Sequence, residues 1–343
     1  MIIHLNSDIS TGQRQDIFNR LDQIGYSGSE VTTQFSHYIV AVGKKPVDIR
    51  TIGQLPGVLD VYRVSDPYKL VSRKWKLDYT EVAVGNDLTI GPHSLTLMAG
   101  PCSIESEDQI ESTVAHLLSH HIPVMRGGVY KPRSSPYSFR GMGLEGLKLF
   151  ARHCRENGIK IITEVMMVEQ LEDMYDYVDI FQVGARNSQN FNLLDALGRV
   201  DKPVLLKRGM SMTISELLQS AEYIFSNGNE KILLCERGIR TFEDSYRNTM
   251  DVNAIAILKE KSHLPVIADP SHGIGIRKYV DKIARSAVMA GADGVIMEVH
   301  ETPNKAFSDG QQTLDYREAG HLYPQLRELY ELRENFDNIN IVS

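Results

Sequence analysis

Residues 203–209 read PVLLKRG and residues 231–238 read KILLCERG, and in both stretches charged side chains directly follow a short apolar run. A run of this length, bounded by Gly, Pro or charge, is typical of a strand buried on both faces of a parallel sheet. With these two, the set of such runs in chain order is SLTLMAGPC (94–102), PVMRGGVYK (123–131), IKIITEVM (159–166), DIFQVGAR (179–186), PVLLKRG, KILLCERG, LPVIADPSH (264–272) and DGVIMEVH (293–300). The gaps between them leave room for a helix each time. Eight strand-helix units over roughly 250 residues predict an α/β protein with a (β/α)8 TIM barrel.

A doubly wound sheet is the competing architecture, and the sequence after the first run disfavours it. That architecture usually carries a GxGxxG turn after its first strand, and this chain has none there. Two of the intervening segments begin with capping boxes, Ser106 with Gln109 and Thr213 with Glu216. The second ends at Asn227-Gly228, a typical helix stop. These signals predict helices between the strands.

The first 65 residues have a different pattern. Ile17, Leu21 and Ile24 recur at helical spacing, whereas Tyr38 and Val40 alternate as strand residues do. The order of the patterns predicts βαββαβ, a small ferredoxin-like domain. We therefore expect a ferredoxin-like domain at 1–65, a linker at 66–81 and a TIM-barrel domain at 82–343, in which residues 82–94 form a hairpin that plugs the lower end of the barrel.

Composition restricts the classes of partner. The formal net charge of −7 argues against general nucleic-acid binding, which needs a broad basic face. No apolar run approaches the roughly 18 to 20 residues that span a bilayer, and the start MIIHLNSDIS lacks the apolar core of a signal peptide. We therefore expect a cytoplasmic protein without a membrane partner. In that compartment the three cysteines are expected to be thiols or metal ligands rather than disulfides.

Polar side chains follow every predicted barrel strand at its carboxyl end. In a barrel these ends converge on one rim, where such enzymes carry out their chemistry. The cations expected there are Arg126, Lys131, Arg133, Arg186, Lys207 and Arg237. Arg binds phosphate and carboxylate groups in a bidentate manner and Lys acts as a compact charge, so this set predicts a highly anionic pair of substrates. Adjacent strand residues face opposite sides, so alternation alone does not choose Lys207 over Arg208, or Arg237 over Glu236.

A second set at the same rim has the composition of a metal site. It consists of Cys102, His272, Glu298 and Asp309, the last in the loop after the eighth strand. One thiolate, one imidazole and two carboxylates suit a divalent Mn, Fe, Co or Zn ion better than Mg or Ca. His300 is a rival ligand, because it lies two residues beyond Glu298 and so on the same face of the strand.

Seven motifs in the same order resemble 3-deoxy-D-arabino-heptulosonate 7-phosphate (DAHP) synthase. They are GPCSIES (100–106), RGGVYKPRSSPYSF (126–139), GARNSQNF (184–191), LLKRG (205–209), ERGIRTF (236–242), DPSHG (269–273) and MEVH followed by SDGQQ. The likeness covers residues 65 to about 330. It is strongest to the subfamily that carries a small ferredoxin-like (ACT-like) domain at its amino end.

The resemblance implies a metal-dependent, aldol-like condensation of phosphoenolpyruvate with D-erythrose 4-phosphate and water, the first step of the shikimate pathway. The family's metal ligands map onto Cys102, His272, Glu298 and Asp309. Its phosphoenolpyruvate site maps onto Arg186 and Arg237 for the phosphate, with Arg126, Lys131 and Lys207 around the carboxylate. The sugar phosphate is expected at Lys131, Pro132, Arg133 and Ser134, where Ser replaces the family's Thr but keeps a hydroxyl donor.

The resemblance also suggests roles and partners. Lys131 lies between the two substrate positions and is the expected proton donor, with Cys102 and metal-bound water as alternatives; His272 completes the predicted catalytic group. The small domain resembles modules that bind amino acids. It predicts feedback inhibition by tyrosine or phenylalanine within a homotetramer, although the segment YSGSEVTTQF (26–35) offers hydroxyls without a diagnostic ligand pattern.

Three alternative functions remain open. The first is 3-deoxy-D-manno-octulosonate 8-phosphate synthase, which uses arabinose 5-phosphate and carries a different, Asn-containing loop at the position of residues 131–134. The second is a metal-free aldolase that forms a Schiff base through Lys207. The third is a non-catalytic amino-acid sensor, which would have lost the ligands that are all present here.

Overall fold

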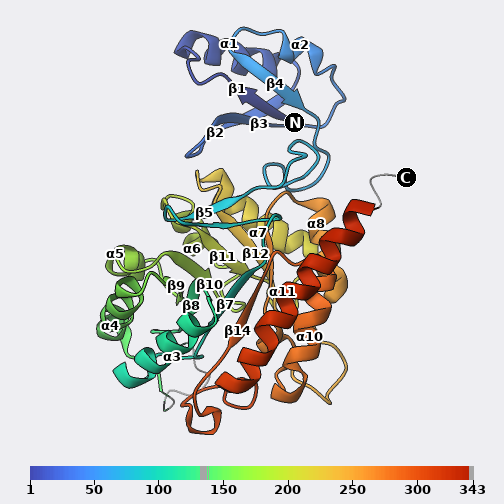
Figure 1. The fold of residues 1–343 in the computed structure, drawn as a ribbon. Coiled ribbons are helices and arrows are strands. Elements are labelled where there is room, and N and C mark those ends of the chain that lie inside the picture. Colours follow the sequence, from blue (N-terminus) through green and yellow to red (C-terminus); the bar gives the residue numbers. More distant parts are fainter. Residues whose placement is uncertain (132–136, 138, 340–343) are drawn as a thin grey trace.

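A computed structural model of the 343-residue chain describes residues 1–131, 137 and 139–339. Parallel strands close into a barrel below the small domain (Figure 1). Their order around the barrel is β10-β11-β12-β13-β14-β7-β8-β9. These strands are β7 (Thr96–Gly100), β8 (Val124–Arg126), β9 (Lys160–Val165), β10 (Ile180–Val183), β11 (Val204–Lys207), β12 (Ile232–Glu236), β13 (Val266–Ala268) and β14 (Gly294–Glu298). The predicted (β/α)8 TIM barrel is confirmed.

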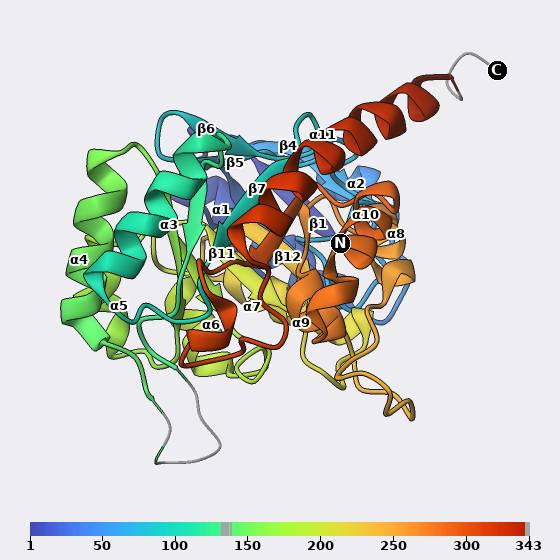
Figure 2. The same ribbon diagram turned by 60° about the horizontal axis from the view of Figure 1, so that its bottom comes forward.

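Helices surround this barrel (Figure 2). They are α3 (Glu107–Ser119), α4 (Gly143–Glu156), α5 (Gln170–Tyr175), α6 (Phe191–Leu197), α7 (Ile214–Ser226), α8 (Val252–Lys261), α9 (Pro270–Ile274), α10 (Arg277–Met289) and α11 (Tyr316–Ile339), with a short 3-10 helix η1 (Pro303–Lys305). The capping box of Thr213 and Glu216 is present at α7, which has Asn227 as its C-cap. At α3 only half of the predicted box forms, because the Gln109 side chain accepts a hydrogen bond from Glu105 N–H rather than from Ser106.

Alternate residues of the barrel strands point into the barrel. The inward side chains, packed in one apolar cluster, are Met98, Val124, Ile162, Ile180, Leu205, Leu233, Cys235, Ile267 and Ile296. The antiparallel hairpin of β5 (Val82–Val84) and β6 (Leu88–Ile90) adds Val82, Val84 and Ile90 to this cluster. The predicted plug is therefore confirmed, and the barrel interior is a filled core rather than a channel. We call the carboxyl ends of the strands the upper end of the barrel and the amino ends the lower end.

The small domain is a four-stranded antiparallel sheet in the order β2-β3-β1-β4. Its elements are β1 (Ile2–Leu5), α1 (Thr11–Gln23), β2 (Tyr26–Thr32), β3 (His37–Gly43), α2 (Arg50–Gly53) and β4 (Val58–Tyr62). The element order is the predicted βαββαβ, although α2 is a single turn. Ile3, Ile17, Leu21, Ile39 and Ile52 form its separate core.

The small domain packs on the lower end of the barrel (Figure 1). Thr33 and Tyr38 donate hydrogen bonds to Glu230, which precedes β12, and Gln34 bonds to Asn229. The connecting segment is packed as well: Glu222 of α7 accepts three backbone N–H groups from residues 69–71 at 2.9 to 3.1 Å. Trp75 is buried against Tyr38. The connection is thus held against the barrel by hydrogen bonds and aromatic packing.

Within the described part of the chain, the helices are too short or too polar for one of them to cross a membrane.

Candidate active site

Strand alternation brings three predicted cations and one predicted carboxylate to the upper end of the barrel interior. Lys207 is two residues beyond the inward Leu205, and Arg237 is two residues beyond the inward Cys235. In the same way Glu298 follows Ile296, and Arg126 follows Val124. All four side chains are at most 5% exposed. The strands therefore aim these charged groups at one buried volume above the apolar core.

The neighbouring residues Arg208 and Glu236 lie on the opposite face of the sheet. Arg208 Nη1 donates to Glu236 at 2.8 Å and to Asp251 at 2.9 Å, and its Nε donates to the Met212 carbonyl. Burial raises the pKa of the Glu236 carboxyl, although the Arg208 guanidinium opposes this rise. The charges of this pair are satisfied between barrel and helices, so Lys207 and Arg237 are the members that face the candidate site.

Three of the four predicted metal ligands form a tight group. Sγ of Cys102 and one carboxylate oxygen each of Glu298 and Asp309 lie within 4.8 Å of one another. The Cys102 thiol lies 3.2 Å from Asp309 Oδ2. His272 borders this group, with Nε2 at 3.5 Å from Glu298 Oε1. Cys102, Glu298 and Asp309 therefore lie closely enough to share an ion, with His272 at their border. A sulfur, a ring nitrogen and two carboxylates are a donor set that fits a borderline divalent ion.

Local backbone structure fixes these donors. Asp309 has a left-handed backbone with φ of 52°, a conformation that Asp tolerates better than most residues. Glu298 N–H donates to Ser271 Oγ at 2.9 Å, which ties β14 to α9. The Glu298 carboxylate accepts from Arg126 Nη1 through Oε1 and from Gln312 Nε2 through Oε2, each at 2.7 Å. The carboxylate is therefore held on both oxygens.

The electrostatic environment differs between the thiol and the carboxyls. Burial raises the pKa of the Cys102 thiol to about 12, the Glu298 charge adds to this rise, and Lys131 opposes it. Burial also acts to raise the pKa of Asp309, but His272 and the Cys102 hydrogen bond outweigh it and lower that pKa to about 2. His272 and Arg126 likewise outweigh burial and lower the pKa of Glu298. The carboxyls are ready to bind a cation at neutral pH, whereas the thiol must first lose a proton.

The rival ligand His300 has a different role in the structure. Its Nδ1 accepts a hydrogen bond from Thr302 N–H at 2.9 Å. His300 therefore stabilises the turn after β14, and it lies outside the Cys102, Glu298 and Asp309 group.

Lys131 lies directly beside this group. Its Nζ donates to both Sγ and the carbonyl oxygen of Cys102, each at 3.0 Å. Gly128 makes room for this contact, because a Cβ at that position would lie 2.7 Å from Lys131 Cδ. The ammonium of Lys131 is thus positioned at the edge of the candidate metal site.

The buried cations keep unused hydrogen-bonding capacity. Nε of Arg126 has no partner among the described residues. Arg237 is 5% exposed, and among the described residues its guanidinium makes one hydrogen bond, a 3.5 Å contact with the Gly238 carbonyl. Burial lowers the pKa of Arg237, although Asp269 opposes this. Such buried donors are costly unless an anion binds them.

Arg186 and the sugar-phosphate residues complete the comparison with the sequence. Arg186 is exposed in the loop after β10 and lines a pocket of about 200 Å³ together with Ser188 and Arg240. It lies at the outer edge of the site rather than among the buried cations. Pro132, Arg133 and Ser134 lie outside the described residues, so their predicted contacts stay predictions.

Sequence reasoning missed three polar residues at this end. Asp269 is 1% exposed and its Oδ2 accepts from Lys207 Nζ. Gln312 holds Glu298, and Arg247 Nη1 donates to Asp309 at 3.2 Å and to Gln312 at 2.9 Å. Asp269 could have been found, because it follows the inward Ile267 by two residues. Gln312 and Arg247 lie on loops, where the strand period gives no signal.

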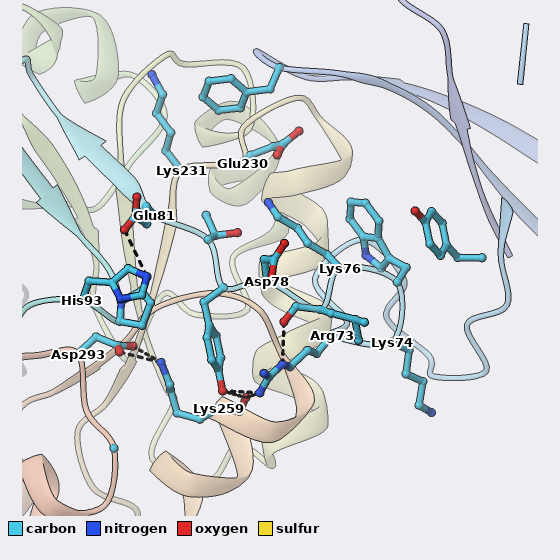
Figure 3. A pocket seen from close by; sticks show the side chains of 18 of the residues that line it. Arg73, Lys74, Lys76, Asp78, Glu81, His93, Glu230, Lys231, Lys259 and Asp293 are labelled. Carbon is cyan, nitrogen blue, oxygen red and sulfur yellow. Dashed lines mark hydrogen bonds and ion pairs between the residues drawn. The ribbon is translucent and has the colours of Figure 1, made fainter. Parts of the chain in front are cut away.

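Two other clusters are weaker candidates for a functional site. Glu107, Glu111 and His153 group on the outside of the barrel, but Arg152 already pairs with Glu107 there. A cleft of about 1850 Å³ lies between the small domain, residues 73–81 and the lower end of the barrel (Figure 3). Some of its charges already have partners, such as Lys259 with Asp293. The upper end, rather than this cleft, has the composition of a reaction site.

The comparisons with known proteins agree with this geometry. Residues 75–335 match the DAHP synthetase I family. A curated relative, phospho-2-dehydro-3-deoxyheptonate aldolase of Thermotoga maritima, is 44% identical over 95% of this chain and 90% of its own length. A 2-dehydro-3-deoxyphosphooctonate aldolase of Syntrophobacter fumaroxidans is 33% identical over 71% of this chain and 90% of its own.

Solved structures add the same relationship in three dimensions. The crystal structure of phospho-2-dehydro-3-deoxyheptonate aldolase (DAHP synthase) from Thermotoga maritima covers 96% of this chain and 97% of its own, with a TM-score of 0.77 and 40% identity. A truncated form of the 3-deoxy-D-arabino-heptulosonate 7-phosphate synthase from the same organism covers 77% of this chain and 97% of its own, with a TM-score of 0.72 and 43% identity. This chain is an enzyme that belongs to the DAHP synthetase I family.

Proposed function

We propose that this enzyme condenses phosphoenolpyruvate with D-erythrose 4-phosphate and water to give 3-deoxy-D-arabino-heptulosonate 7-phosphate and phosphate. One observation carries the proposal: at one end of the barrel, a thiol, an imidazole and two carboxylates lie beside buried cations with unused donors. The name of the relative that is 44% identical over 95% of this chain points to the same reaction. The enzyme would act on small phosphorylated metabolites, in the cytoplasm as expected from the sequence and in the homotetramer that the resemblance predicts.

The divalent ion would be held by Cys102, His272, Glu298 and Asp309, as Mn, Fe, Co or Zn. When bound, such an ion supplies Lewis-acid polarisation and orientation of the sugar aldehyde. The remaining steps fall to the side chains around it.

The cations of the upper end, which are buried except for Arg186, bind and align the phosphoenolpyruvate. Arg237 and Arg186 hold its phosphate, and Arg126, Lys131 and Lys207 surround its carboxylate. The sugar phosphate lies at Lys131, Pro132, Arg133 and Ser134. Cations fixed before the reaction lower the cost of bringing two anions together and place the reacting carbons close to each other.

The bond changes can be followed atom by atom. C3 of phosphoenolpyruvate attacks the aldehyde carbon of the sugar, and the new carbon-carbon bond leaves the aldehyde oxygen as an alkoxide that takes up a proton. Lys131 Nζ is our candidate donor, because it lies 3.0 Å from Cys102 Sγ beside the ligand group. Cys102 is the alternative donor, and His272 completes the catalytic group. Water then adds to C2, and inorganic phosphate leaves from that carbon.

The decisive experiment follows the loss of phosphoenolpyruvate with each sugar phosphate. We expect turnover with erythrose 4-phosphate that is abolished by chelation and restored by added Mn²⁺ or Zn²⁺. Faster turnover with arabinose 5-phosphate would instead support the octulosonate synthase reaction of the relatives that are about one-third identical. Activity that survives EDTA, together with a covalent enzyme–substrate adduct after borohydride reduction, would support a Schiff base at Lys207. The contact between Lys207 and Asp269 opposes that chemistry, because an ammonium that donates to a carboxylate has no free lone pair.

We also propose that tyrosine or phenylalanine inhibits the enzyme through the small domain. The support is its position: it binds the barrel at Glu230, and β12 begins two residues later and leads directly to Arg237. An assay of the intact enzyme with each amino acid tests this. Unchanged rates with both would leave the small domain with a role in assembly alone.

A further inference from the structure

One buried carboxylate lies between a predicted metal ligand and a predicted substrate-binding cation. Asp269 follows β13 and is 1% exposed. Its Oδ1 accepts a hydrogen bond from His272 N–H at 3.1 Å and so caps α9. Its Oδ2 accepts from Lys207 Nζ and also lies 2.8 Å from His272 Nδ1. The same oxygen therefore lies within hydrogen-bond distance of two nitrogens, one from Lys207 and one from His272.

In this structure the Lys207 contact has hydrogen-bond geometry, and the His272 contact does not. Nδ1 of His272 is buried and has no aligned hydrogen-bond partner within the described residues, despite its closeness to Asp269 Oδ2. The other ring nitrogen, Nε2, points to the ligand group and lies 3.5 Å from Glu298 Oε1. His272 is thus held through its backbone, while its ring still lacks a full hydrogen bond on the side away from the metal site.

A carboxylate that accepts from the outer nitrogen of a ligating histidine fixes the ring and its tautomer, and its loss typically weakens metal binding 10- to 100-fold. At this site the carboxylate is shared with a cation that would bind phosphoenolpyruvate. When an anion draws Lys207 Nζ toward itself, Asp269 Oδ2 becomes free to accept from His272 Nδ1. The ring is then oriented, with its Nε2 lone pair toward the ligand group.

We propose that Asp269 is a positioning residue that makes metal binding and phosphoenolpyruvate binding mutually reinforcing, by passing its hydrogen bond from Lys207 to His272. This inference rests on the proposed function. Thermodynamic linkage requires the reinforcement to be equal in both directions. A coupling of this kind is typically 5- to 150-fold.

The test measures binding rather than turnover. Affinity for Co²⁺ is followed by the thiolate-to-cobalt absorption band, with and without phosphoenolpyruvate, and affinity for phosphoenolpyruvate by calorimetry, with and without Co²⁺. In the wild type we expect each ligand to tighten the other by about tenfold. In Asp269→Asn we expect the affinity for Co²⁺ to fall about 10- to 100-fold and the mutual effect to shrink to less than about twofold.

The chain offers a matched control for this substitution. Asp293 is also 1% exposed and also accepts from a lysine, Lys259, but at the lower end of the barrel. Asp293→Asn should therefore lower stability while leaving both affinities and their coupling unchanged. A second variant, Lys207→Met, keeps Asp269 and His272. It should weaken phosphoenolpyruvate binding and remove its effect on Co²⁺ affinity.

The outcomes separate the inference from the proposed function. If the wild type turns over phosphoenolpyruvate with erythrose 4-phosphate but Asp269→Asn or Lys207→Met keeps the full mutual effect, the inference is wrong and the function stands. Equal coupling losses in Asp269→Asn and Asp293→Asn would also overturn it, because the effect would then be a general result of destabilisation. A wild type that binds Co²⁺ but not phosphoenolpyruvate would overturn both.

Discussion

At the lower end of the barrel Lys259 donates two hydrogen bonds to Asp293, and Asp293 also accepts the backbone N–H of Val266. At the upper end Glu298 is shared by Arg126, Gln312 and His272, and Asp269 is shared by Lys207 and His272. Both ends bury carboxylates beside cations. They differ in whether the charged groups already have all their hydrogen-bond partners before a ligand binds.

This difference follows from what each end has to do. A closed ion pair stabilises one arrangement, and removing one partner leaves a costly buried charge. An end that must accept anions and a cation needs groups with spare capacity, such as the unpartnered Nε of Arg126. Strand β12 joins the two ends, since Glu230 lies two residues before it and Arg237 directly follows it. Paired charges therefore anchor the lower end, and shared charges prepare the upper end for ligands.

The largest effect should come from Cys102→Ala, which removes one of the predicted metal ligands at the upper end. We expect a fall in kcat of about 10³-fold or more, equivalent to roughly 4 kcal/mol, and loss of bound metal. Steady-state kinetics and metal analysis measure both. Cys154→Ala is the matched control, because Cys154 is a buried thiol outside the barrel, packed against Met125. Equal losses in the two variants would contradict a special role for Cys102.

A paired comparison of Arg237→Met and Arg208→Met separates the two faces of the same sheet. Arg237 has no carboxylate partner among the described residues, so its loss should leave the free energy of unfolding nearly unchanged. The KM for phosphoenolpyruvate should rise about 100-fold, because charge-assisted bonds to the anion are lost. Arg208→Met breaks buried contacts with Glu236 and Asp251 and should destabilise the fold by about 3–5 kcal/mol. Denaturant unfolding and steady-state kinetics measure both effects. A stability loss in Arg237→Met and a KM increase in Arg208→Met would contradict this assignment of the two faces.

These two residues also show how far the sequence leads. The barrel could be predicted because eight apolar runs recur with helix-length gaps, and both faces of each strand are buried. The same double burial hides which residues point inward, so alternation could not separate Lys207 from Arg208. The four ligand candidates could be named because each follows a strand or its loop. Their mutual distances depend on barrel closure, which no local pattern contains.

The charge at the upper end could be predicted only in part. Counting cations suggested a strongly positive cavity, but Glu298 and Asp269 offset Arg126 and Lys207 in the structure. Asp269 appears in the DPSHG motif, where it reads equally well as a helix cap, and it does cap α9. Its second contact, with Lys207 from another strand, is a tertiary feature. The sequence therefore indicates the local role of Asp269 as a helix cap but not its tertiary role as a partner of Lys207.

A smaller effect concerns pH and the upper end. Burial and Glu298 raise the pKa of the metal-free Cys102 thiol to about 12, so the thiol is protonated between pH 6 and 9. A pKa of about 2 keeps Asp309 ionised over the same range. Binding an ion as thiolate must then release one proton, and the association constant should rise about tenfold per pH unit. Calorimetry in two buffers of different ionisation enthalpy counts the protons. A pH-independent affinity would show that the sulfur does not bind the ion. The Cys102→Ser variant gives the pH dependence expected for a site without the sulfur.

The smallest effect on catalysis should come from Glu230→Ala at the lower end. This change leaves the hydroxyls of Thr33 and Tyr38 without their shared acceptor, and we expect a loss of about 1–3 kcal/mol in domain docking. Thermal melting should show the small domain separating earlier, while kcat without effectors stays within about twofold, because the upper end keeps its groups. Glu331→Ala, at an exposed position on α11, controls for the lost charge.

Inhibition by tyrosine or phenylalanine gives this variant a second readout. If the small domain acts on the site through the start of β12, Glu230→Ala should weaken inhibition more than it changes kcat, because the hydrogen bonds between domain and strand are gone. Inhibition that is as strong as in the wild type would mean that the effector signal reaches the upper end by another route, such as Glu222 and the segment 69–71. The difference between paired charges at the lower end and shared charges at the upper end would then explain stability and catalysis but not regulation.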